Sequence, residues 1–167
     1  MESPGTSYLY TLALLGMTFM GFAAIVMLLR QTLGGHVRAF DVLFARVYME
    51  FAVIVIAGAM LPPLLMLWGL PIEAVWRLSS GLVGVPLLAI AVGYPARRRA
   101  TTGEPTPRYV RVNVTIILLI SLTLLFVATG MLHERSGPVF LAALTAFLTF
   151  VLVAWLQALS IILVPKA

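Results

Sequence analysis

The chain has 167 residues, of which 62% are hydrophobic and 10% are charged, and its formal net charge is +5. Soluble domains average about 45–50% apolar and about 25% charged residues, so a water-soluble fold could not bury this much apolar surface. The apolar segments are continuous rather than alternating, which favours membrane-spanning helices over a β-barrel. Cysteine is absent, which excludes disulfides, thiolate nucleophiles and thiolate metal sites.

Five apolar segments are long enough to cross a bilayer, which requires about 20 residues for roughly 30 Å of hydrocarbon. They are residues 8–29, 47–68, 74–94, 112–132 and 138–164. The first segment lacks the basic stretch that precedes a secretory signal, so we predict that it is a permanent span. The sequence therefore predicts an all-α integral membrane protein, in which residues 1–167 form a single bundle of five transmembrane helices.

The loop after the first span contains a second helical pattern. Gly34 and Gly35 can end the first helix. Beyond them, apolar residues recur at helical spacing with charged residues among them: Val37, Phe40, Leu43, Phe44 and Val47. This pattern predicts a short amphipathic helix on the inner membrane surface, before the second span.

The second span contains two prolines that a shorter helix would avoid. Residues 47–61 number 15 and would extend only about 22 Å, which is too short to span. Continuing to Trp68 gives 22 residues and about 33 Å, but it places Pro62 and Pro63 inside the helix. Pro62 removes the hydrogen bond to the Gly58 carbonyl, so we predict a kinked helix with a hinge at Gly58, Pro62 and Pro63.

Arg46 and Glu50 lie at the start of the same span, one turn apart on one helix face. They form the candidate functional charge pair. One interpretation is an interfacial carboxylate that pairs with arginine. The other is a carboxylate that faces the bundle near a proline hinge, as in ion or proton pathways.

The third and fourth spans are joined by a stretch rich in arginine. Pro71 and Glu73 predict the start of the third helix, and Tyr94 followed by Pro95 predicts its end. Residues 95–111 then predict a mobile basic connector. Its arginines are candidate contacts for anionic lipid headgroups: Arg97, Arg98, Arg99, Arg108 and Arg111.

The basic residues also predict the orientation. Five spans place the two termini on opposite sides of the membrane. One side holds nine basic residues, and the other holds only Arg77 and Arg135. The positive-inside rule therefore predicts an outside N-terminus and a cytoplasmic C-terminus in a plasma or inner membrane. The nine are Arg30, Arg38, Arg46, Arg97, Arg98, Arg99, Arg108, Arg111 and Lys166.

Residues that could carry catalysis are sparse. His36 and His133 fall in loops on opposite faces, so they cannot share a metal or haem within one chain. Asp41 is the only aspartate and also lies in a loop. No catalytic or metal-ligand constellation is recognisable, so we expect neither an enzyme nor a cofactor.

These observations favour a non-catalytic membrane protein, acting as a subunit, assembly factor or sensor in a larger membrane complex. The alternative is a small oligomeric transporter or channel that uses Glu50 and the kinked second helix. The expected partners are the lipid bilayer, anionic lipids on the cytoplasmic face, and other subunits or further copies of the chain. Nucleic acid is not expected, because the basic residues fall between apolar segments.

Overall fold

The computed structural model describes residues 5–32, 39–103, 105–132 and 135–163. Within these residues the chain forms five long α-helices and no strand. Each helix is long and apolar enough to cross a membrane, so the prediction of an all-helical chain with five candidate membrane spans is confirmed. The helices are α1 (Thr6–Thr32), α2 (Ala39–Leu67), α3 (Ile72–Thr102), α4 (Arg108–Ala128) and α5 (Ser136–Leu163).

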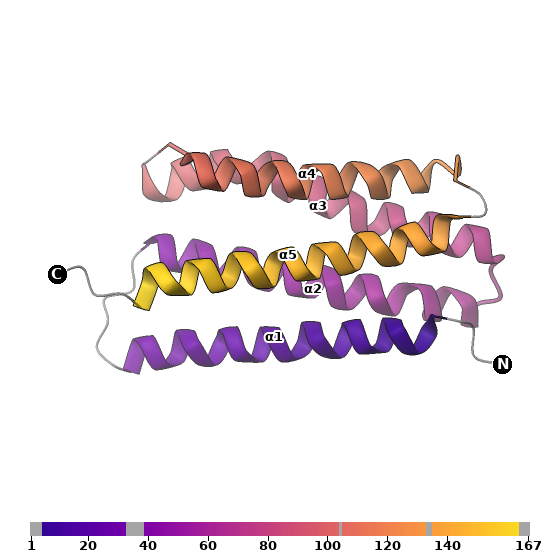
Figure 1. The fold of residues 1–167 in the computed structure, drawn as a ribbon, viewed down its shortest axis with the longest axis horizontal. Coiled ribbons are helices and arrows are strands. Elements are labelled where there is room, and N and C mark those ends of the chain that lie inside the picture. The colour runs from indigo at the N-terminus through magenta and orange to yellow at the C-terminus, as the bar shows by residue number, and fades with distance from the viewer. Residues whose placement is uncertain (1–4, 33–38, 104, 133–134, 164–167) are drawn as a thin grey trace.

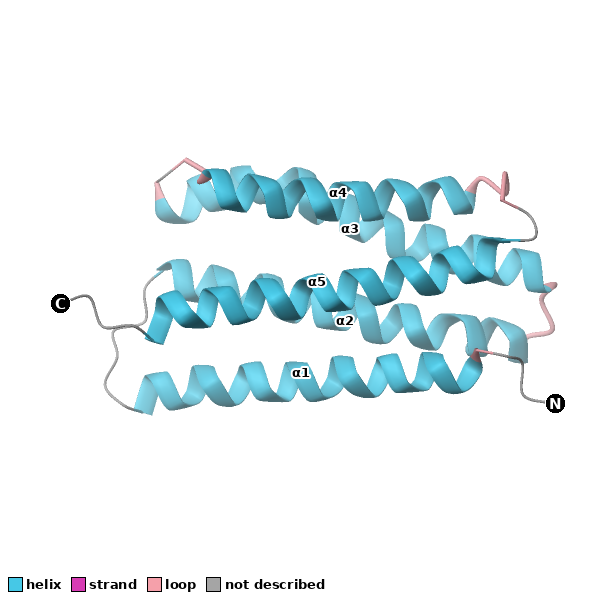
Figure 2. Ribbon diagram, in the orientation of Figure 1, coloured by secondary structure: helices cyan, strands magenta, loops and turns pink. Residues whose placement is uncertain are grey.

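The five helices run along one common axis and alternate in direction (Figure 1). Consecutive helices pack against each other, and α5 also contacts α2, α3 and α1. A short connection, residues 68–71, joins α2 to α3 (Figure 2). The start of α2, the end of α3 and the start of α4 lie at one end of the bundle, which we call the basic end because it carries Arg46, Arg97–Arg99, Arg108 and Arg111.

Aromatic and aliphatic side chains fill the centre of the bundle. The Phe51 and Phe147 rings join α2 to α5 in an edge-to-face pair with centroids 5.2 Å apart. The Phe19 and Trp155 rings join α1 to α5 in the same way at 5.5 Å. Such contacts stabilise a bundle in lipid, where helices gain no hydrophobic energy from leaving their solvent.

Small residues allow α3 to approach its neighbours closely. A Cβ atom added at Gly58 of α2 would lie 2.8 Å from Val83 Cγ2 of α3. One added at Gly84 of α3 would lie 3.1 Å from Leu125 Cγ of α4. Both glycines therefore mark helix contacts where a side chain has no space.

The second helix runs through both prolines, as predicted. α2 extends from Ala39 to Leu67, and the side chains of Pro62 and Pro63 are buried within the bundle. It starts upstream of residue 47, so the described part of the segment expected to form the amphipathic surface helix, from Ala39 onward, runs directly into the span. Val37, Gly34 and Gly35 lie outside the described residues.

The prediction that α3 ends at Tyr94 is wrong. The helix continues through Pro95 to Thr102, and only residues 103–107 separate it from α4. Proline removes one backbone hydrogen bond, but the alanines and arginines after it are strong helix formers. Gly103 ends the helix with φ +70°, and its N–H donates to the Arg99 carbonyl. The expected mobile connector is therefore mostly helix.

The contact at Gly58 generates a stability prediction. Gly58→Ala should lower the free energy of unfolding by about 1–3 kcal/mol, because the β-branched Val83 cannot easily rotate away. Thermal unfolding in one detergent measures the change. Combining Gly58→Ala with Val83→Ala should cost less than the sum of the single variants.

Gly21→Ala is the matched control, because nothing lies within 4 Å of an added Cβ there. Alanine favours a helix over glycine by about 1 kcal/mol, so this variant should be at least as stable as the parent chain. Equal stability of Gly58→Ala and Gly21→Ala would contradict the proposed close contact.

Candidate functional site

Glu50 bridges two arginines from two helices. Its Oε1 atom accepts a hydrogen bond from Arg46 Nε at 3.1 Å, within α2. Its Oε2 atom accepts one from Arg97 Nη1 at 2.9 Å, across to α3. The structure thus brings together Arg46 and Glu50 and adds Arg97, which sequence reasoning had placed in a loop. We call Arg46, Glu50 and Arg97 the charge cluster.

The charge cluster lies on the outer face of the bundle. The exposed side-chain fractions are 74% for Arg46, 45% for Arg97 and 27% for Glu50. Two cations and one anion leave a net charge of +1. All three side chains line an open groove between α2 and α3, whereas Pro62 is fully buried in the bundle. The groove that Glu50 lines therefore does not reach Pro62.

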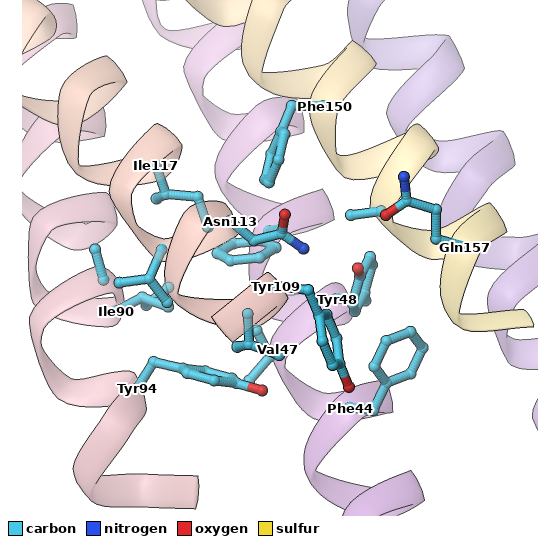
Figure 3. Close-up of a pocket in the computed structure, with 15 residues that line it drawn as sticks. Phe44, Val47, Tyr48, Ile90, Tyr94, Tyr109, Asn113, Ile117, Phe150 and Gln157 are labelled. Atoms are coloured by element: carbon cyan, nitrogen blue, oxygen red, sulfur yellow. The ribbon is translucent and has the colours of Figure 1, made fainter. Parts of the chain in front are cut away.

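A separate cavity lies inside the basic end, where α2, α3, α4 and α5 meet. Its volume is about 110 Å³. Figure 3 shows side chains from these four helices converging on it. We call it the aromatic pocket, because six of its lining residues carry aromatic rings: Phe44, Tyr48, Phe51, Tyr94, Tyr109 and Phe150. The other lining residues are Val47, Ile90, Ala91, Val110, Asn113, Val114, Ile117, Ala154 and Gln157.

Ring contacts hold the α2 wall of the aromatic pocket in place. The Tyr48 ring lies against Phe44 with centroids 4.3 Å apart, and it meets Phe51 at 6.0 Å in an edge-to-face arrangement. Phe19 of α1 supports it from behind at 6.4 Å. Three neighbouring rings therefore contact Tyr48, which is buried at 9% exposure.

Polar atoms interrupt this apolar lining. They are the hydroxyls of Tyr48, Tyr94 and Tyr109 and the amides of Asn113 and Gln157. Asn113 lies five residues inside α4, which is about 7.5 Å along the helix. Its side chain forms no hydrogen bond to another residue that the structure describes. A polar group in a membrane helix without such a bond is costly, and it can bind a ligand that supplies one.

Arg98 lies one turn beyond Tyr94, a residue that lines the aromatic pocket, on the same helix α3. Arg98 is only 4% exposed, although the sequence grouped it with its neighbours as a lipid contact. Burial follows from the helical continuation of α3, which turns Arg98 inward and leaves Arg97 and Arg99 exposed. Arg108 and Arg111 are also exposed, at the start of α4.

Asn113 and Gln157 were missed by the sequence reasoning. The available signal was an amide within an otherwise apolar run, which is rare at membrane depth and often functional. No comparable signal marks the aromatic residues, because aromatic rings are common near the ends of transmembrane helices.

Three other polar residues singled out in the sequence cannot be placed in a site. His36 and His133 lie outside the described residues, and so does the side chain of Asp41. In the part of the chain that the structure describes, no three acidic, histidine or cysteine side chains cluster as metal ligands. Arg77 lies at the opposite end of the bundle, where its Nε donates to the Ala128 carbonyl of α4 at 3.4 Å.

The chain matches no protein-family model, and no curated protein or solved structure is significantly similar to it. The geometry of the aromatic pocket and of the charge cluster therefore carries the functional argument.

The charge cluster generates a prediction about its two arginines. Arg97→Gln should destabilise the bundle more than Arg46→Gln, because the Arg97 pair joins two helices and the Arg46 pair lies within one. Both effects should be within about 1 kcal/mol, since these side chains are partly exposed. Thermal unfolding at low and high salt measures them, and salt should reduce both. A larger loss from Arg46→Gln would contradict this assignment.

Proposed function

We propose that the protein is a non-catalytic sensor subunit of a membrane complex, which binds a small, mainly apolar molecule in the aromatic pocket. The single observation that carries this proposal is the convergence of aromatic rings, tyrosine hydroxyls and the Asn113 amide on one cavity. The ligand would carry an apolar ring or short chain and at least one hydrogen-bonding group.

The composition of the aromatic pocket supports this ligand class. Binding sites for small molecules are mostly apolar, with a few placed polar groups that fix the orientation of the ligand. Four helices contribute to this pocket, so a ligand there would contact most of the bundle. A bound molecule could thereby alter helix packing, which is the property that a sensor subunit needs.

The arrangement of the polar residues gives less support to the alternative, a transporter or channel. Glu50 lies in the outer groove, and Pro62 is buried away from it. Thr115 and Thr123 of α4, and Thr129 directly after it, donate to carbonyls of the same helix: Thr115 to Arg111, Thr123 to Leu119 and Thr129 to Phe126. Such bonds satisfy the hydroxyls without a water-filled path.

We further propose that the basic end faces the cytoplasm in a plasma or inner membrane. The exposed arginines at this end support that orientation through the positive-inside rule. The same residues would contact anionic headgroups there, namely Arg97, Arg99, Arg108 and Arg111. The first turns of α2 would lie at that membrane surface as the amphipathic segment.

The orientation can be tested with single cysteines, because the chain has none of its own. Pro105→Cys lies in the exposed connection at the basic end, and Met131→Cys, at a position 72% exposed, lies at the opposite end. In intact cells an impermeant thiol reagent should label Met131→Cys and leave Pro105→Cys unlabelled. Both should label after detergent solubilisation. The reverse pattern in intact cells would overturn the proposed orientation.

The ligand proposal can be tested by filling the pocket. Ala154 is 7% exposed and lines the cavity, so Ala154→Phe should place a ring where the ligand would lie. Solvent extraction and mass spectrometry of the purified parent chain should find a small molecule that is absent from Ala154→Phe. Asn113→Leu should retain less of it, because the hydrogen-bonding amide is lost.

Ala57→Phe provides the matched control for this experiment, because Ala57 is exposed on α2 and does not line the pocket. It should retain the molecule at the level of the parent chain. The same extract from all four proteins would contradict the proposed sensor site.

A further inference from the structure

The open groove between α2 and α3 has polar and apolar parts at opposite ends. Its volume is about 840 Å³. The charge cluster lies at its basic end, and Val53, Ile54 and Pro86 lie at its deep end. We call it the α2–α3 groove. The lining residues are Met27, Val42, Ala45, Arg46, Met49, Glu50, Val53, Ile54, Pro86, Ala89, Ile90 and Arg97.

The length of the groove matches one leaflet of a bilayer. On α2 it extends from Val42 to Ile54, which is 12 residue steps and about 18 Å. On α3 it extends from Pro86 to Arg97, which is 11 steps and about 16 Å. Half of a hydrocarbon core of roughly 30 Å is about 15 Å. The groove therefore begins at headgroup level and ends near the bilayer centre.

Small side chains create the space for an apolar chain. Ala45 and Ala89 line the groove on α2 and α3, where larger residues would close it. Ala89 is exposed, and Val53 beside it on the facing helix is 54% exposed. An acyl chain would cover this apolar surface with closely fitting contacts, which are the main source of attraction between apolar groups in lipid.

The charge cluster provides the complementary headgroup site. Its net charge of +1 attracts an anion. Each arginine has five N–H donors and donates one hydrogen bond to Glu50, which leaves donors for a phosphate. Glu50 also positions the two guanidinium groups on both sides of the groove, and arginine is well suited to phosphate recognition.

From these observations we infer that the α2–α3 groove binds one anionic phospholipid, with its phosphate on Arg46 and Arg97 and an acyl chain along Val53, Ala89 and Pro86. This lipid site is separate from the aromatic pocket and does not depend on the proposed sensor function. It also differs from general headgroup attraction, because it requires both the charges and the apolar groove.

Native mass spectrometry tests the lipid site directly. The full chain in a mild detergent is titrated with phosphatidylglycerol or with phosphatidylcholine of the same acyl chains. The parent chain should bind one phosphatidylglycerol about fivefold more tightly than phosphatidylcholine, as expected for one net charge near an anion. R46Q/R97Q should remove that preference. R77Q/R135Q, which removes the same charge at the opposite end of the bundle, should keep it.

The apolar half is tested with A89F, which should weaken binding of both lipids. V92F is its matched control, because Val92 is 67% exposed on α3 and does not line the groove. Thermal unfolding establishes that each variant is folded. If R46Q/R97Q does not fold, R46Q/E50Q/R97Q replaces it without leaving a lone carboxylate, and it should also lose the preference.

Three outcomes would overturn the lipid site. One is a phosphatidylglycerol preference that persists without the groove arginines. Another is an equal loss in R77Q/R135Q, which would indicate overall charge alone. The third is evidence that the site binds a free anion without an acyl chain. Unchanged lipid binding in A89F, or displacement of the lipid by an equal concentration of glycerophosphate, would give that evidence.

Discussion

The close packing of α3 against α2 and α4 is the constraint on which both proposed sites depend. Lipid tails are as apolar as the side chains they surround, so helices in a bilayer are held by shape and not by escape from solvent. Gly58 and Gly84 allow that fit, because an added Cβ at either position would lie 2.8–3.1 Å from a neighbouring helix's side chain. With α3 fixed in this way, one of its faces forms a wall of the aromatic pocket and another forms a wall of the α2–α3 groove.

The two sites share one residue, Ile90, which lines both the aromatic pocket and the α2–α3 groove. A molecule in the pocket and a lipid in the groove would therefore contact opposite sides of the same side chain. A shift of the Ile90 side chain on binding at one site could therefore change the affinity of the other site. This requires that the bundle has two arrangements to which the bound molecules have different affinities. Residues near the opposite end of the bundle, such as Arg77, line neither site.

The continuation of α3 past Pro95 has the largest consequence for electrostatics. In a mobile connector the arginines would be interchangeable headgroup contacts. On a helix they point in different directions: Arg97 reaches Glu50 at 2.9 Å, and Arg98 is buried beside Tyr94. Rotation of about 100° per residue thus separates neighbouring arginines into an exposed groove contact and a buried side chain.

The sequence by itself determined the five apolar helices and the passage of α2 through Pro62 and Pro63. Backbone groups in lipid must be hydrogen-bonded within the chain, so segment length and hydropathy are sufficient to identify a helix. The sequence also determined that Arg46 and Glu50 share a face, because they are at positions i and i+4 of one helix. Only the tertiary structure decided that Arg97 completes their cluster and that Asn113 meets Tyr48 across a cavity. Those contacts depend on the rotation and register of one helix against another, which are set by side-chain packing between distant residues and leave no local pattern in the sequence.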